Sequence, residues 1–172
     1  MRKIGQTLRF LIPVIALVAL VVFMTGAGRR KRAKEAFLAA VAPVYEAWNT
    51  GNADLLDEVY APDCLFHWPP YPDTEGLEAH KQFLAAVRSA FPDFQLTMDQ
   101  AMLDGDLGLT RWTWRGTHTG EFFGLPPTGK RVVVSGCTIG QWVEGKVVEE
   151  WKYSDELGAH QQLGFKVIPP GE

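Results

Sequence analysis

Apolar and polar residues change along the chain from a helical period to strict alternation. Apolar side chains recur at helical spacing in residues 33–50 and 75–90, which predicts a helix over each range. Pro43 lies inside the first range, so we expect a kink or a second helix start there. Residues 53–60 fit a short helix, and residues 64–67 fit a short strand that ends before three prolines.

Alternation of apolar and polar residues begins after Phe91 and predicts a series of strands. The predicted strands cover residues 94–98, 109–116, 131–143 and 147–153. Glu144 and Gly145 fit a hairpin turn between the last two, and residues 155–164 fit a short terminal helix. Helices followed by successive strands are typical of an α+β fold in which helices pack on one antiparallel sheet.

Residues 10–28 form a run of 19 residues without a charged side chain. As a helix this run would span roughly 28 Å, close to the hydrocarbon thickness of a bilayer. We therefore predict one transmembrane helix at 10–28, after a basic tail (1–9) and before a basic juxtamembrane stalk helix (29–42). A cleaved signal peptide is the alternative, because residues 25–27 resemble a cleavage site. The length of the run and the five basic residues after it favour the anchor.

The charge of the chain is divided sharply between the N-terminal segment and the rest. Residues 1–34 hold eight basic and no acidic residues, while the remainder has nine basic and 20 acidic residues, a net charge of −11. An acidic body repels phosphate backbones, which argues against nucleic acid as a partner. The larger basic group follows the apolar run, so the positive-inside tendency favours a single-pass membrane protein with its domain on the cytoplasmic side.

Cysteine and histidine are too sparse and scattered to indicate a metal site. The two cysteines, Cys64 and Cys137, make no disulfide framework and lack the paired spacing of a zinc site. The four histidines also have no ligand spacing. We expect no metal, and the sequence leaves the distance between Cys64 and Cys137 open.

The last predicted strand carries the strongest candidate for acid–base chemistry. Alternation places five of its residues on one face: Val147, Glu149, Trp151, Tyr153 and Asp155. We expect this larger, more aromatic face to point inward, where a buried carboxyl group acquires a raised pKa suited to proton transfer near neutrality. The alternative is structural: Asp155 caps the following helix, and Glu149 pairs with Arg111 or Arg115.

Histidine and tryptophan side chains are the other candidates for a pocket. His118 lies between small residues at a strand end and could donate a hydrogen bond or relay a proton, although a packed loop histidine is the simpler interpretation. His67 follows a strand and could line a cavity mouth. Trp112 and Trp114 share one strand face and could line a cavity for a planar ligand or fill the core.

Several short motifs occur in a characteristic order: Phe91-Pro92-Asp93, Gly116-Thr117-His118-Thr119-Gly120-Glu121, Pro127-Thr128-Gly129-Lys130, Gly145-Lys146-Val147-Val148-Glu149 with Trp151 and Asp155, and Gln162-Leu163-Gly164. Over residues 43–165 the chain resembles the SnoaL-like polyketide cyclase (ester cyclase) family, which leaves 166–172 as a tail. The resemblance implies the cone-shaped α+β fold of the nuclear transport factor 2-like superfamily. In that fold a curved antiparallel sheet is wrapped by N-terminal helices around a central pocket.

The same resemblance implies a function. Cyclases of this family close a ring by intramolecular aldol condensation of a polyketide ester, without metal or cofactor, and an Asp serves as general acid/base. The matching residue here is Asp155, with His118 in the pocket. Asp155 would take a proton from the carbon next to a carbonyl, and His118 or Tyr153 would stabilise the enolate. Relatives commonly pair through the open sheet face, which implies a homodimer.

We therefore predict a membrane-anchored acid–base enzyme acting on a small hydrophobic carbonyl compound. Because the compared cyclases lack an anchor, a lipophilic ligand drawn from the membrane becomes a candidate substrate. A non-catalytic module that binds an apolar ligand in the same cone is the first alternative. An epoxide-opening hydrolase is the second, and it requires Arg111 or Arg115 inside the pocket with Asp155.

Overall fold

The computed structural model describes residues 28–166. The predicted membrane helix at 10–28 lies outside the described residues except for Gly28, as do the predicted tail at 1–9 and residues 167–172. Within the described part, no helix is both long enough and apolar enough to span a bilayer. The chain divides into two units, Met1–Ala36 and Phe37–Glu172. In the first unit residues 28–36 are helical, and the second unit contains the fold described next.

The second unit is built on one six-stranded sheet with the strand order β2-β1-β6-β5-β4-β3. The strands are β1 (Tyr60–His67), β2 (Thr74–Glu75), β3 (Gln95–Asp104), β4 (Leu107–Thr117), β5 (Arg131–Val143) and β6 (Lys146–Ser154). Strands β3 to β6 pair antiparallel in succession, as hairpin connections require. The prediction of a wholly antiparallel sheet is wrong, because β1 runs parallel to β6. No hairpin joins these two strands, so nothing local fixes their relative direction.

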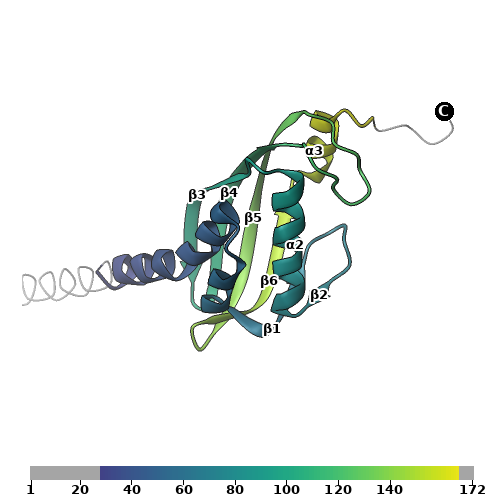
Figure 1. Cartoon of the computed structure of the whole chain (residues 1–172). Helices are drawn as coiled ribbons and strands as arrows, with labels where there is room; N and C mark the ends of the chain where they lie inside the picture. The colour runs from purple at the N-terminus through teal and green to yellow at the C-terminus, as the bar shows by residue number, and fades with distance from the viewer. Residues whose placement is uncertain (1–27, 167–172) are drawn as a thin grey trace, which may run out of the picture. The chain divides into compact units, whose positions relative to one another are not determined.

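Helices cover one face of this sheet (Figure 1). They are the helical residues 37–50, the 3-10 helix η1 (Ala53–Glu58) and α2 (Leu77–Ala90), while α3 (Glu156–Leu163) contacts β5. The helix predicted over 75–90 is confirmed as α2, two residues shorter. No second start occurs at Pro43, since the helix continues through it to residue 50.

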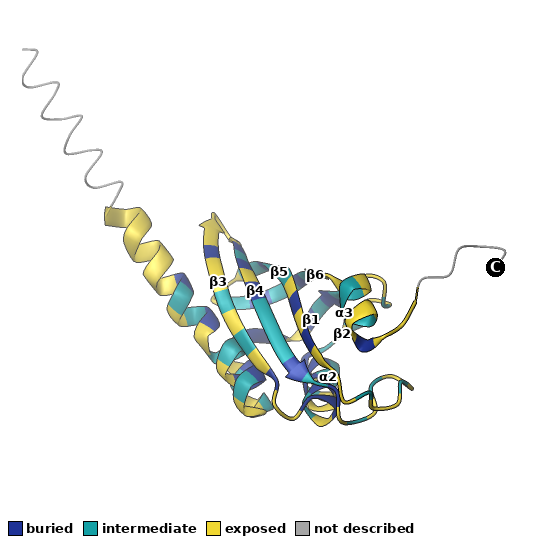
Figure 2. Cartoon of the chain, turned by 90° about the horizontal axis from the view of Figure 1, so that it is seen from above, coloured by how far each residue is buried: buried dark blue, intermediate teal, exposed yellow. Residues whose placement is uncertain are grey.

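An aromatic core lies between the helices and the sheet. Measured between centroids, the Trp48 ring lies 5.5 Å from the Phe94 ring and 5.9 Å from the Phe83 ring. These contacts join the first helix, residues 37–50, to α2 and to the start of β3. Leu84 of α2 is 1% exposed. Figure 2 shows β3 as an alternation of buried or half-buried and exposed positions, as expected for an edge strand with one face on the core.

A β-bulge in β6 decides which of its side chains point inward. Gln141 of β5 pairs with Glu149, but the next residue, Trp142, pairs with Val147, so Val148 has no partner on β5. One extra residue reverses the alternation beyond it. Val147 therefore points inward at one end of the strand, and Glu150, Lys152 and Ser154 point inward beyond the bulge. The face predicted to point inward is thus the outer face from Glu149 to Asp155, and Tyr153 is 49% exposed.

Candidate functional site

A cavity of about 120 Å³ lies between the helices and the concave side of the sheet. Most of its wall is aromatic or aliphatic, which favours an apolar ligand. The aromatic part of the wall consists of Phe37, Tyr45, Trp48, Tyr60, Trp68, Phe83, Phe91, Phe94, Trp112, Trp114, Phe122 and Trp142. Every one of these residues lies between 37 and 142, so the cavity belongs to the second unit alone.

A short polar stripe crosses this apolar wall along β6 and the start of α3. It consists of Glu150, Lys152, Ser154 and Glu156. Ser154 accepts a hydrogen bond from the indole Nε1 of Trp68 at 3.3 Å and donates one to the carboxylate of Glu156. These are the convergent polar groups that a mostly apolar pocket needs to orient a ligand.

Glu150 is the most deeply buried carboxyl group of the stripe. It is 4% exposed, and its Oε2 accepts a hydrogen bond from the Tyr60 hydroxyl at 2.5 Å. Burial raises the pKa of Glu150, while the charge of Lys152 and the Tyr60 hydrogen bond act in the opposite direction. Burial and the neighbouring Glu150 charge raise the pKa of Tyr60 well above its ordinary value, so its hydroxyl remains a donor.

Lys152 places its amine against aromatic rings. Its Nζ lies 4.9 Å from the Trp68 ring, 5.1 Å from the Trp48 ring and 5.6 Å from the Phe83 ring, measured to the centroids. Burial lowers the pKa of this amine, and the charges of Glu150 and Glu156 oppose that shift. The cavity therefore brings together a carboxyl group, a phenol and an amine, each with a perturbed pKa.

Asp155 does not line the cavity. It is exposed and forms the N-cap of α3, where its Oδ1 accepts a hydrogen bond from the Gly158 amide at 2.9 Å. This is the structural alternative considered from the sequence, and it follows from the position of an Asp just before a helix. Tyr153 is likewise outside the wall, whereas Trp112 and Trp114 are part of it.

His118 is buried beside the cavity but is not part of its wall. Its ring stacks on Phe91 at 5.1 Å, and its Nδ1 lies 3.3 Å from the Thr128 hydroxyl oxygen. Its Nε2 has no hydrogen-bond partner among the described residues. Burial lowers the pKa of His118, which favours the neutral ring. The structure thus does not bring His118 and Asp155 together around one cavity.

His67, Glu149 and Trp151 form a second group on the other side of β1 and β6. The His67 ring lies between two carboxylates, which accept hydrogen bonds from its N–H groups, with Nδ1 at 2.9 Å from Asp73 Oδ1 and Nε2 at 2.9 Å from Glu149 Oε1. It also stacks on Trp151 at 5.4 Å. The partner of Glu149 is therefore His67, and Arg111 pairs instead with Asp99 at 3.2 Å.

Replacement of His67 by Gln is expected to cost more stability in acid than in alkali. Glu149 and then Asp73 raise the pKa of His67, so its charged form stabilises the fold. That contribution is complete below the unfolded pKa of about 6.5 and disappears as the pH rises through the higher folded pKa. Both carboxylates are well exposed, so the effect stays below about 1 kcal/mol. Urea unfolding of both proteins near pH 6 and pH 9 measures it; equal costs at the two pH values would contradict it.

Neither cysteine forms a disulfide, and no metal-binding cluster is found in residues 28–166. Cys64 is buried and Cys137 half-buried, and both are free thiols. Burial and the nearby Glu150 charge raise the pKa of Cys64 to about 12. No group of three or more His, Cys, Asp or Glu side chains in this part of the chain is placed to hold a metal ion.

The sequence analysis missed the polar residues that line the cavity, among them Tyr60, Glu150 and Lys152. Glu150 directly follows Glu149 in the sequence, so an error of one residue in the alternation exchanges one carboxylate for the other. The alternation of residues along β6 does not reveal the bulge at Val148, which causes this error. Tyr60 comes from a strand far away in the sequence, 90 residues before Glu150.

Comparisons with known proteins find relatives that cover most of the chain. The aklanonic acid methyl ester cyclase DauD of Streptomyces sp. is 28% identical over 131 residues, which cover 72% of this chain and 79% of DauD. The nogalonic acid methyl ester cyclase of Streptomyces nogalater is 28% identical over 126 residues, covering 69% and 90% of the two chains. The crystal structure of IdmH from Streptomyces antibioticus matches with a TM-score of 0.66 and 33% identity, covering 75% of this chain and 99% of IdmH.

The family-level match is more extensive than any single motif. The model of the family described as SnoaL-like polyketide cyclase matches residues 39–163, which include all of the strands, η1, α2 and α3. The curved mixed sheet with helices on one face is the nuclear transport factor 2-like cone that the resemblance implied. With the fold and this match in agreement, the chain belongs to the SnoaL-like polyketide cyclase family.

Proposed function

We propose that this protein is a cofactor-independent acid–base enzyme that cyclises a small, hydrophobic polyketide-type ester. The observation that carries the proposal is the carboxyl group of Glu150, which is hydrogen-bonded to Tyr60 and held in an aromatic cavity. A general base works best when its pKa lies near the working pH, and burial moves the pKa of Glu150 upward in that direction. Family membership and the two methyl ester cyclases support the reaction class.

In this proposal the ionised Glu150 removes a proton from the carbon next to a carbonyl group of the bound ester. The enolate then attacks a second carbonyl in the same molecule and closes the ring. Developing negative charge on oxygen is stabilised by N–H and O–H donors held in a water-poor site. Lys152 is such a donor, because its side chain lines the cavity on the same face of β6 as Glu150.

The test offers the full-length chain the methyl esters of aklanonic acid and nogalonic acid. Because an intramolecular aldol addition neither adds nor removes atoms, the expected product has the mass of the substrate and a different chromatographic retention. Conversion of either ester above the rate without protein supports the proposal. Binding of both esters without conversion would support the ligand-binding module in its place.

Asp155 and His118, the catalytic residues predicted from the sequence, remain the alternative to Glu150. Family resemblance supports Asp155, but its exposed position as the cap of α3 favours Glu150 as the acid–base group. The epoxide-hydrolase alternative has less support, since it needs an arginine beside a carboxylate in the cavity. Neither Arg111 nor Arg115 is part of the cavity wall.

Membrane attachment through residues 10–28 is part of the proposal and is supported by the sequence alone. Lysine at two central positions of this run, Val18→Lys with Val21→Lys, is expected to abolish attachment, because each charge costs about 2.5–3.5 kcal/mol at the centre of a bilayer. The measurement is the share of full-length chain that stays with membranes after an alkaline wash. Val18→Leu with Val21→Leu is the control and should behave as the unaltered chain. Equal sedimentation of the lysine variant would contradict the anchor.

The homodimer implied by the resemblance also remains a proposal. Val133 and Tyr153 are each 49% exposed on the outer face of β5 and β6, where a second chain could cover them. Light scattering of the full-length chain and of Val133→Lys would test it, and a monomeric unaltered chain would contradict it.

A further inference from the structure

The amine of Lys152 is placed unlike that of an ordinary surface lysine. Three aromatic rings from the first helix, from the segment after β1 and from α2 surround its Nζ at 4.9 to 5.6 Å. The side chain belongs to the wall of the cavity, two residues beyond Glu150 on the same face of β6. A ligand that fills the cavity would therefore meet this amine directly.

We propose that Lys152 is a covalent site, at which its amine forms an iminium ion with the carbonyl carbon of a small hydrophobic aldehyde or ketone. The inference rests on the proposed function in one respect, since it requires that the cavity admits a carbonyl compound. It goes further by replacing hydrogen bonding of the carbonyl oxygen with a carbon–nitrogen bond.

The surroundings of Lys152 favour the reactive form of the amine. Only the neutral amine has the lone pair that attacks carbon, and desolvation of a lysine in an apolar pocket increases its share at neutral pH. Lys152 is in such a pocket, and the desolvation of its amine there lowers its pKa. The Tyr60 hydroxyl holds the carboxyl group of Glu150 in a hydrogen bond at 2.5 Å.

The same surroundings favour the iminium product. An iminium ion remains cationic but has fewer N–H groups to hydrate than an ammonium ion, so it loses less on transfer into an apolar cavity. The faces of Trp48, Trp68 and Phe83 stabilise a desolvated cation at this position. The aromatic wall also limits the water that would hydrolyse the carbon–nitrogen bond.

The bonds and protons balance without an oxidant, reductant or further reactant. Nζ attacks the carbonyl carbon, the carbon–oxygen bond breaks, and the oxygen leaves as water with one amine proton and the proton of the Glu150 carboxyl. The products are the iminium ion, which keeps one N–H, and the Glu150 carboxylate. Glu150, as the carboxylate, then removes a proton from the adjacent carbon to give an enamine. The enamine carbon adds to a second carbonyl, and hydrolysis of the resulting iminium frees Lys152.

Reductive trapping tests the inference on the full-length chain in detergent. The chain is incubated with 3-phenylpropanal and sodium cyanoborohydride at neutral pH, and peptide mapping by mass spectrometry locates the reduced adduct. We expect Lys152 to be labelled severalfold faster than any exposed lysine, because a larger share of its amine is neutral at this pH. Lys152→Arg should lose the fast label, whereas Lys130→Arg, which alters an exposed lysine outside the cavity, should retain it.

A second measurement separates failure of this inference from failure of the proposed function. Quenching of tryptophan fluorescence by 3-phenylpropanal, without reductant, reports entry into the cavity because Trp48, Trp68, Trp112, Trp114 and Trp142 line it. Quenching with label spread evenly over exposed lysines would overturn the covalent site and leave the acid–base proposal intact. Absence of both quenching and label would count against a carbonyl-binding cavity and so against both.

Discussion

Replacement of Glu150 by Gln is expected to lower turnover of a methyl ester substrate by about 10²- to 10⁴-fold, the usual contribution of a general acid or base. Gln has the same shape and can still accept the hydrogen bond from the Tyr60 hydroxyl, which is 2.5 Å long in the structure. The fold should therefore persist while the proton acceptor is lost. The measurement is kcat/KM for ring closure, with circular dichroism and thermal unfolding as checks on the fold.

Asp155→Asn is the matched control for this result. Asn caps a helix as well as Asp does, so the hydrogen bond to the Gly158 amide and the start of α3 should be retained. Because Asp155 is exposed and outside the cavity wall, its variant is expected to keep turnover within a few-fold of the unaltered chain. The reverse outcome, with Glu150→Gln active and Asp155→Asn inactive, would return the acid–base role to Asp155.

Most of the helices and strands could be predicted from the sequence because each depends mainly on the pattern of its own residues. The two-residue strand β2 was not predicted, and β3 continues to Asp104, beyond the predicted range 94–98. The range 131–143, predicted from alternation, is β5 with the same bounds. The strand directions could be predicted only where a turn joins neighbours, so the parallel pairing of β1 with β6 was missed. Local pattern carries information about adjacent residues, whereas this pairing depends on the packing of the whole domain.

The cavity was only partly predictable for a related reason. Trp112 and Trp114 lie on a strand without a bulge between them and face the cavity, as simple alternation allows. On β6 the unpaired Val148 reverses the alternation, and the predicted set of side chains is displaced by one residue. A bulge of this kind is a property of two strands together, and the sequence of one strand does not reveal it.

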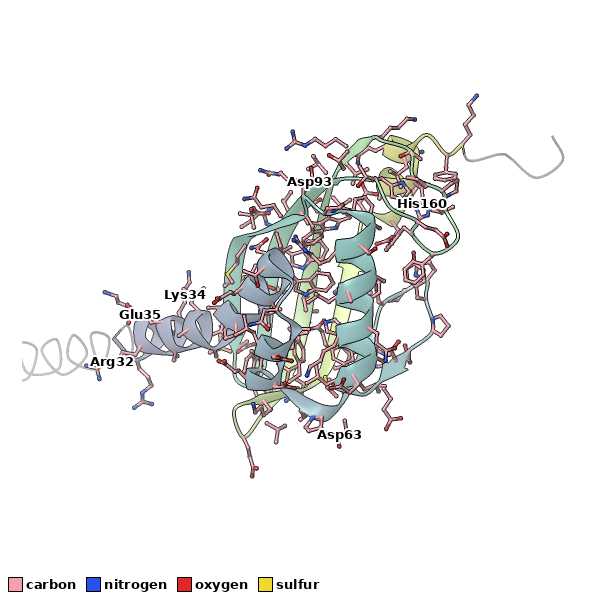
Figure 3. The ribbon with its side chains drawn as sticks, viewed as in Figure 1. Arg32, Lys34, Glu35, Asp63, Asp93 and His160 are labelled. Atoms are coloured by element: carbon pink, nitrogen blue, oxygen red, sulfur yellow. The ribbon has the colours of Figure 1, made fainter. Side chains whose placement is uncertain are left out.

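The Gly116–Glu121 motif was interpreted as the site of a pocket histidine, and the structure gives it a packing role. The amides of Thr119 and Gly120 both donate to the carbonyl oxygen of Ala90 at 3.0 Å, where α2 ends. Two residues before Thr119, the Thr117 amide and hydroxyl both donate hydrogen bonds to the carboxylate of Asp93. These contacts lie at the end of the domain where Figure 3 labels Asp93 and His160. The segment after β4 is therefore held by hydrogen bonds to the end of α2.

Gly120→Ala is expected to destabilise the domain by about 1–3 kcal/mol or more, the cost of overpacking a filled space. A Cβ at Gly120 would lie 2.4 Å from the Ser89 carbonyl oxygen and 3.0 Å from the Ala90 Cα, both backbone atoms. Backbone atoms at the end of a helix cannot turn aside as a side chain does, so either the hydrogen bonds to Ala90 or the end of α2 must move. Urea unfolding at neutral pH measures the change in free energy.

Gly140→Ala is the matched control for Gly120→Ala, because it adds the same Cβ atom at a site where the neighbouring atoms can move. A Cβ at Gly140 meets side-chain atoms only, the nearest being Val147 Cγ1 at 3.3 Å, and both residues border the cavity. Val147 has space to yield there, so Gly140→Ala should cost clearly less than Gly120→Ala. Equal costs would mean that the junction between α2 and β4 yields as easily as the cavity wall, and the motif would then need an explanation other than close backbone packing.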